Sequence, residues 1–173
     1  MNETVVDEKN VRRWRYGTAP REELASRSGL DFLAGISSGE LPAPPIAEGL
    51  AFEPREMSPG RAVFVGWPGE QHLNPLGTIH GGYAATLLDS CMGCAVQTLL
   101  ERGEGFTTLE LKVNFLRPLL PGMGPVSAVG TAIHRGSRTA VAEGRLEDQD
   151  GRLLAYGTST CLILDLKQFA RTD

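Results

Sequence analysis

The chain has 173 residues, which is enough for one domain with a substantial core and too few for two ordinary domains. Hydrophobic residues make up 41% and charged residues 22%, a balance typical of soluble globular proteins. With a net charge of −4, the chain lacks the positive field that nucleic-acid binding requires. Its long uncharged stretches contain polar residues and glycine, which is not typical of a membrane span. We therefore expect neither a nucleic-acid partner nor a membrane span.

Cysteine content and the first residues indicate the compartment. The three cysteines, Cys91, Cys94 and Cys161, are an odd and low number, which argues against a disulfide framework and favours the cytoplasm. Residues 1–8 are acidic and lack the apolar run of a signal peptide. Cys91-x-x-Cys94 lies in an apolar helical run without a second pair of ligands, so the pattern favours buried thiols over a metal or redox site.

Residues 1–45 are expected to form an N-terminal helical extension that ends in a proline-rich linker. Helix-start signals occur between Thr18 and Glu23, and a second short apolar face follows at residues 30–36. The sequence Leu-Pro-Ala-Pro-Pro at 41–45 is typical of a stiff, extended connector. A lid, a brace and additional packing are all consistent with this extension.

Six strands are predicted around one long helix. Two of them precede the helix, and Pro54 places the first at a sheet edge because proline cannot donate to a neighbouring strand. Four more form a meander after the helix, separated by turns that contain glycine. The expected strands lie at 51–57, 61–65, 105–117, 124–135, 138–148 and 152–164. We therefore expect an α+β domain over 46–165, a curved antiparallel sheet wrapped around a central helix, followed by a tail at 166–173.

The helix predicted over 83–100 contains one charged residue, Asp89. Apolar residues occur on all of its faces, which is typical of a helix that the protein surrounds completely. A lone carboxylate in such a helix costs free energy unless it is paired or the site needs it. By itself, the pattern is equally consistent with a catalytic aspartate and with a hydrogen-bonded structural one.

Two glycines, Gly81 and Gly82, open this helix after His80. Glycine allows a ligand to approach the backbone closely, and the first N–H groups of a helix have no internal partner. Such groups suit a carbonyl oxygen that gains negative charge during a reaction. A turn selected only for tight packing would give the same residues.

The spacing of Gly81 and Asp89 adds a geometric condition. Eight residues separate them on one helix, which corresponds to about 12 Å along the axis. A carboxylate cannot cross that distance to attack a carbonyl group held at the Gly81 amide. If both residues act on one substrate, Asp89 must come from a second subunit, so the spacing predicts a site shared across a two-fold interface.

The combination of Asn74, His80-Gly81-Gly82 and Asp89, six and then nine residues apart, resembles the motif of PaaI-like hotdog thioesterases. The resemblance covers roughly 45–165 and includes the strand that ends Asn-Phe-Leu-Arg-Pro at 114–118. It implies a hotdog fold and hydrolysis of acyl-CoA thioesters by a homodimer or homotetramer. It implies no cofactor, since coenzyme A is part of the substrate.

The resemblance also implies a role for each residue of the motif. The Gly81 amide polarises the thioester carbonyl, and Asp89 of the partner subunit is the nucleophile or the general base. Asn74 positions water or the thioester, and Thr108 is the hydroxyl residue beside the acid. His80, which orients the loop, and Gly82 contact the substrate.

Coenzyme A and the alternative reactions are less clearly indicated. The turn at 135–139 is rich in hydrogen-bond donors, so Ser137 and Arg138 are candidate ligands of the coenzyme A phosphates, although two solvated arginines at a hairpin tip would look the same. No His-Glu-x-x-His motif occurs, which argues against a zinc enzyme. A hotdog-fold dehydratase and a non-catalytic acyl-CoA binding module remain the alternatives to a thioesterase.

Overall fold

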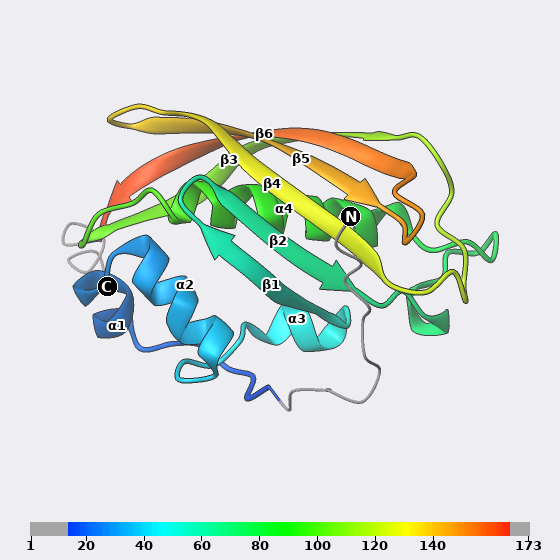
Figure 1. Cartoon of the computed structure of the whole chain (residues 1–173), viewed down its shortest axis with the longest axis horizontal. Helices are drawn as coiled ribbons and strands as arrows, with labels where there is room; N and C mark the ends of the chain where they lie inside the picture. Colours follow the sequence, from blue (N-terminus) through cyan, green and yellow to red (C-terminus); the bar gives the residue numbers. More distant parts are fainter. Residues whose placement is uncertain (1–13, 167–173) are drawn as a thin grey trace.

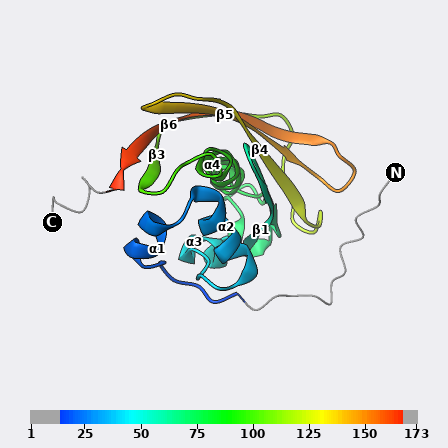
Figure 2. The same cartoon turned by 60° about the vertical axis from the view of Figure 1, so that its left-hand side comes forward.

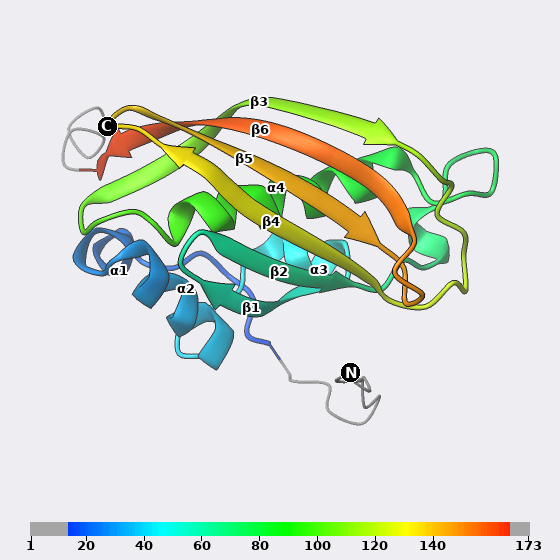
Figure 3. The ribbon, with the colours of Figure 1, turned by 45° about the horizontal axis from the view of Figure 1, so that its top comes forward.

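The helix α4, Gly81–Gln97, lies in the hollow of a curved six-stranded sheet (Figures 1 and 3). The computed structural model describes residues 14–166. All neighbouring strands are antiparallel and follow the order β1-β2-β4-β5-β6-β3. The strands are β1 Phe52–Ser58, β2 Arg61–Gly66, β3 Glu104–Phe115, β4 Val126–Arg135, β5 Thr139–Glu147 and β6 Leu153–Asp165. The expected α+β arrangement is confirmed, and β1, which contains Pro54, is an edge strand as predicted.

Small residues on the inner face of the sheet allow α4 to pack closely against it. Alanines at 62, 128, 140 and 142 are fully buried there, opposite leucine, methionine and valine side chains of α4. The approach is closest at Gly130, where an added Cβ would lie 2.2 Å from the carbonyl oxygen of Cys91. A larger residue at that position would push the helix off the sheet.

Three short helices cover the side of α4 that the sheet leaves open (Figure 2). They are α1 Arg21–Ser26, α2 Gly29–Ser38 and α3 Pro45–Gly49, and α2 contacts both α4 and β1. The hydroxyl of Ser28 accepts from the Asp31 amide and caps α2, while Gly39 ends it with a φ of 83°. None of the helices in residues 14–166 is long and apolar enough to cross a membrane.

The N-terminus of α2 is fixed to the C-terminal end of α4. The Gly29 amide donates to the Leu100 carbonyl oxygen over 2.9 Å. An added Cβ on Gly29 would lie 1.7 Å from the Gln97 carbonyl oxygen, so only glycine fits this contact. The extension is therefore packed into the same unit as the sheet and α4.

A β-bulge interrupts β3 at Leu109. Thr108 pairs with Cys161 and Glu110 with Thr160, so Leu109 is an extra residue without a partner on β6. Seven residues separate Thr108 from Phe115, which would place them on opposite faces of a regular strand. The extra residue brings both onto the face that α4 covers.

Two expectations about boundaries are wrong. The central helix, expected over 83–100, ends at Gln97, because the Thr98 hydroxyl donates to the Ala95 carbonyl oxygen and accepts the Gly60 amide. The connector expected over 41–45 stops at Pro44, because Pro45 begins α3, where its missing N–H has no cost. Residues 1–13, and the expected tail at 166–173 apart from Leu166, lie outside the described residues.

Candidate active site

Asp89 and Thr108 meet between the central helix and the edge strand. Thr108 Oγ1, on β3, donates to Asp89 Oδ1, on α4, over 2.9 Å. Both residues are half-buried, and the carboxylate makes no other hydrogen bond to residues 14–166. The hydroxyl donor fixes the orientation of the carboxylate, and the second oxygen is left for a substrate or a water molecule.

The N-terminus of α4 presents an unused backbone donor. His80 is the N-cap residue, and its Nδ1 accepts the Gly82 amide over 2.9 Å while its carbonyl oxygen accepts the Tyr83 amide. Among the residues that the structure describes, the Gly81 amide then has no acceptor. It lies at the positive end of the helix dipole, where an oxygen with developing negative charge would be stabilised.

The ring of Phe115 lies against Gly81. A Cβ added to Gly81 would be 3.2 Å from Phe115 Cζ, which is closer than an ordinary van der Waals contact. Phe115 itself is 57% exposed, although it is a large aromatic residue. Because Gly81 has no side chain, the backbone at the start of α4 and the ring of Phe115 can lie close together without a clash.

Asn74 closes the loop that precedes α4. Its Nδ2 donates to Thr78 Oγ1 over 2.8 Å, and its Oδ1 accepts the amides of Leu76 and Thr78. The Asn74 backbone amide also donates to the Thr78 carbonyl oxygen. The side chain therefore holds the loop in shape, and one amide hydrogen is left to meet a substrate.

The predicted residues form two groups in one chain. Asp89 and Thr108 are in contact near the middle of α4, whereas His80, Gly81 and Gly82 lie at its start. Because Gly81 and Asp89 both lie on α4, eight residues apart, the axial rise of about 12 Å separates the two groups. One chain alone does not bring the carboxylate to the Gly81 amide.

The turn proposed for coenzyme A is an exposed hairpin tip. Ser137 and Arg138 are both exposed between β4 and β5. Arg135 is not available for a phosphate, since its Nη2 lies 2.6 Å from both carboxylate oxygens of Glu104. Of the two arginines in the turn, only Arg138 presents an unpaired guanidinium within residues 14–166.

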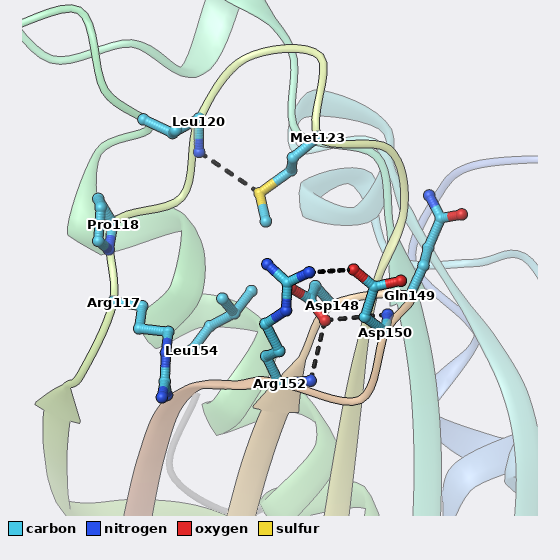
Figure 4. A pocket seen from close by; sticks show the side chains of 9 residues that line it. All are labelled: Arg117, Pro118, Leu120, Met123, Asp148, Gln149, Asp150, Arg152 and Leu154. Atoms are coloured by element: carbon cyan, nitrogen blue, oxygen red, sulfur yellow. Dashed lines mark hydrogen bonds and ion pairs between the residues drawn. The ribbon is translucent and has the colours of Figure 1, made fainter.

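A second polar region lies beyond the other end of the sheet (Figure 4). There, a hollow of about 430 Å³ lies between the β3–β4 connection and the β5–β6 hairpin. Arg117 donates to the Leu153 carbonyl oxygen, and Arg152 pairs with Asp150 over 2.5 Å. With Asp148, the hollow contains two arginines and two aspartates, so it has no net charge to attract a phosphate group.

The N-terminal extension forms one wall of an apolar cavity beside Asp89, and this wall was not predicted from the sequence. The cavity has a volume of about 250 Å³ and is walled by α2, α3, β1, β2, β3 and α4. Asp89, Ser90 and Cys94 line it on the α4 side, and Leu33 and Ile36 line it on the α2 side. In the sequence, only the apolar residues of the extension could have indicated this wall. Their contact with α4 depends on tertiary packing, which a local pattern does not contain.

The three cysteines lie in α4 and β6. All three are free thiols, and Cys91 and Cys161 are buried. Burial, with a smaller contribution from the negative charge of Asp89, raises the pKa of Cys94 to about 12. The Cys94 thiol therefore stays protonated at neutral pH and is a poor nucleophile.

Sequence relatives of the chain are described as thioesterases or esterases. Residues 76–155 match the family model of the thioesterase superfamily. A candidate esterase of Saccharolobus solfataricus is 32% identical over 115 residues, which are 66% of this chain and 80% of that protein. Acyl-coenzyme A thioesterase 13 of Mus musculus is 33% identical over 92 residues, which are 53% of this chain and 64% of that protein.

Solved structures extend the similarity to the fold. A candidate thioesterase from Ralstonia eutropha JMP134, described as related to phenylacetic acid degradation, is 30% identical with a TM-score of 0.68, over 75% of this chain and 97% of that one. A mutant of the phenylacetic acid degradation protein PaaI from Thermus thermophilus is 31% identical with a TM-score of 0.62, over 68% and 97%. The chain therefore belongs to the thioesterase superfamily, as a PaaI-like hotdog protein, and is a thioester hydrolase.

Proposed function

We propose that the chain hydrolyses acyl-CoA thioesters at a site that two copies share. The hydrogen bond between Thr108 Oγ1 and Asp89 Oδ1 carries the proposal, because it orients an acid beside an apolar cavity. The mouse relative, an acyl-coenzyme A thioesterase, supports coenzyme A as the thiol part of the substrate. The free thiols are consistent with the cytoplasm, where coenzyme A thioesters are available.

The reaction begins with the thioester carbonyl oxygen at the Gly81 amide. This N–H donor stabilises the negative charge that develops when the carbonyl carbon is attacked. In one route, Asp89 removes a proton from water, the hydroxide adds to the carbonyl carbon, and the carbon–sulfur bond breaks. Coenzyme A leaves as a thiolate and takes the proton back from Asp89.

In the other route, an oxygen of Asp89 attacks the carbonyl carbon directly. The thiolate leaves, and a mixed anhydride joins the acyl group to the carboxylate until water cleaves it. Thr108 serves either route, because its hydroxyl holds one carboxylate oxygen and directs the other toward the substrate. Hydrolysis in ¹⁸O-labelled water under single-turnover conditions separates the routes, because only the anhydride route can leave the label in the protein.

A second copy would bring the two halves of the site together. The strand β3 is a sheet edge, and its side chains Leu109, Leu111 and Phe115 are large, apolar and exposed. Exposed apolar side chains along an edge strand favour pairing with another chain. Two-fold pairing along β3 would place the α4 helices side by side and antiparallel, each Asp89 near the other Gly81. A homodimer satisfies this arrangement, and a homotetramer contains it twice.

The proposal also assigns contacts to the remaining ligand groups. Asn74 uses its free amide hydrogen for the thioester or a water molecule, while its other bonds hold the loop before His80 and Gly82. The proposal assigns Ser137 and Arg138 to the phosphates of coenzyme A, and the unpaired guanidinium of Arg138 within residues 14–166 supports it. No cofactor is needed for either route.

A thiol-release assay tests the proposal. Free coenzyme A is measured with a thiol reagent across short, medium, long and aryl acyl-CoAs, with Asp89→Asn as the inactive control. Steady release that depends on Asp89 supports hydrolysis. Hydration of an enoyl-CoA without thiol release would support the dehydratase instead, and saturable binding without any turnover would support a binding module.

A further inference from the structure

The apolar cavity beside Asp89 has walls from two distant parts of the chain. Leu33 and Ile36 of α2 form one side together with Ala47 of α3. Aromatic side chains of the sheet, Phe52 and Phe64 among them, form another. The only polar groups on the lining are the Asp89 carboxylate, the Ser90 hydroxyl and the Cys94 thiol, all on α4. The cavity therefore suits an apolar group whose one reactive end lies at Asp89.

We propose that this cavity takes the acyl tail of the substrate and that α2 and α3 limit its length. The inference rests on the proposed hydrolysis, because that reaction places the carbonyl carbon within about 3.5 Å of Asp89 or of the water that Asp89 activates. The tail attached to that carbon then has an apolar space next to it in the same subunit. The chain that supplies Asp89 thus receives the acyl group, and its partner supplies the Gly81 amide.

The wall formed by α2 is fixed. The Gly29 amide is bonded to Leu100, and a Cβ on Gly29 would collide with the Gln97 carbonyl oxygen, so α2 is tightly packed on α4. α2 also contacts β1. A helix packed against both α4 and β1 gives the cavity a definite depth and acts as a stop for the acyl chain.

The helices α2 and α3, which form the stop, lie outside the segment that matches the family model. The family model matches 76–155, which includes Asp89 and Cys94 but none of the residues that α2 and α3 contribute. The acyl preference is therefore set largely by residues outside the segment that identifies the family.

The volume sets the class of acyl group. A protein cavity of about 150 Å³ holds a benzene ring of six carbons, so about 250 Å³ holds roughly ten carbons. The inference is therefore a preference for medium-length alkyl or single-ring aryl acyl groups. Each methylene that enters the cavity should improve affinity about fourfold, and methylenes beyond about ten should add nothing.

The test uses S-alkyl-CoA thioethers of increasing length, which have no carbonyl group and are not hydrolysed. Their dissociation constants are measured by calorimetry on the wild-type chain and on four variants. Ala47→Leu fills the cavity and Ile36→Ala enlarges it. The matched controls carry the same substitutions at exposed positions of the same pair of helices, Ala34→Leu on α2 and Ile46→Ala on α3.

We expect the affinity of the wild-type chain to rise with length and to level off near ten carbons. Ala47→Leu should level off about three carbons earlier and Ile36→Ala about three carbons later, as each substitution adds or removes three carbons. The controls should match the wild type. If Ala47→Leu does not fold, as judged by its thermal transition, Ile36→Ala still decides the question in the opposite direction.

In the binding experiment, two results would overturn the inference: affinity independent of chain length, or equal changes in the cavity variants and their controls. Thiol release from the corresponding acyl-CoAs is measured in parallel. A length-dependent binding profile without thiol release would contradict the proposed hydrolysis and leave the cavity assignment intact. Thiol release with no length dependence in any variant would support hydrolysis and reject the cavity as the acyl site.

Discussion

Thr108 and Asp89 lie nineteen residues apart in the sequence and 2.9 Å apart between Oγ1 and Oδ1. One residue belongs to the edge strand and the other to the central helix, so the contact exists only because β3 folds back along α4. The hydroxyl supplies the only hydrogen bond to this carboxylate within residues 14–166. The acid is oriented on one side and accessible on the other.

Asp89→Asn should fold and lose most of its turnover. An amide is neither a nucleophile nor a base at neutral pH, so kcat should fall roughly 10²-fold or more. Removing a half-buried charge should leave the melting temperature unchanged or slightly higher. Thiol release and a thermal melt on the same preparation provide both numbers. Turnover close to wild type would remove Asp89 from the reaction.

Thr108→Ala should lose less than Asp89→Asn, about 10- to 100-fold in kcat, because a positioning group is removed and the reacting group stays. Thr108→Ser is the control, since serine retains the hydroxyl that donates to Asp89. It should recover most of the activity. A Thr108→Ser variant as slow as Thr108→Ala would show that the methyl group, rather than the hydrogen bond, is what matters.

Asn74→Ala should reduce activity about 10- to 100-fold and also weaken the loop before α4. Two amides and the Thr78 hydroxyl lose their partner at once, which leaves these groups to find water. Thr78→Val is the comparison, because it removes only the hydroxyl contact. If Asn74 acted only by holding the loop, Thr78→Val would also lose activity, though less than Asn74→Ala. Full activity in Thr78→Val and a large loss in Asn74→Ala would support a direct role for Asn74.

Mixed dimers test the shared site. Gly81→Val, which would clash with Phe115 and block the helix start, and Asp89→Asn should each be inactive alone. In a mixed dimer one site carries both lesions and the other carries none. Mixing, unfolding and reassembling the two proteins should therefore restore activity, toward one functional site per mixed dimer. Verified mixed dimers that stay as inactive as their parents would contradict the shared site.

Gly29→Ala should destabilise the fold by about 1–3 kcal/mol through overpacking against α4. The added methyl group would lie 1.7 Å from the Gln97 carbonyl oxygen, and backbone cannot move aside as a flexible side chain can. Gly49→Ala is the matched control, since an added Cβ there meets nothing within 4 Å. Denaturant unfolding of the two variants measures the difference, and equal stabilities would mean that α2 is not tightly fixed.

Strong local patterns predicted much of this fold. Apolar residues on all faces of the segment around Asp89 indicated the buried helix, and all twelve strand ends lie within two positions of those predicted. Pro54 indicated the edge position of β1 because its missing N–H is a property of the residue itself. These features needed no knowledge of what lies across the fold.

Features that depend on distant contacts were not predicted. The end of α4 at Gln97 is set by Gly60 and Thr98, and apolar Leu99 and Leu100 continue the helical pattern beyond it. The cavity beside Asp89 forms only because α2 packs on α4. The close contact at Gly29 allows this packing, and no local sequence pattern predicts it. The pairing of Asp89 with Thr108 was predicted from the family motif. The number of residues between a helix position and a strand position does not determine the distance between them in space.

The unpaired Leu109 in β3 changes which side chains of that strand point toward α4. Counting residues from Thr108 to Phe115 gives an odd step, and the single insertion makes the two ends equivalent with respect to α4. Deleting Leu109 would restore strict alternation, and one of the two side chains would then turn toward solvent. Either Asp89 would lose its donor or Gly81 its aromatic neighbour. A one-residue gap in an alignment at this position would therefore mark a protein that lacks either the hydroxyl donor to its acid or the aromatic ring at its helix start.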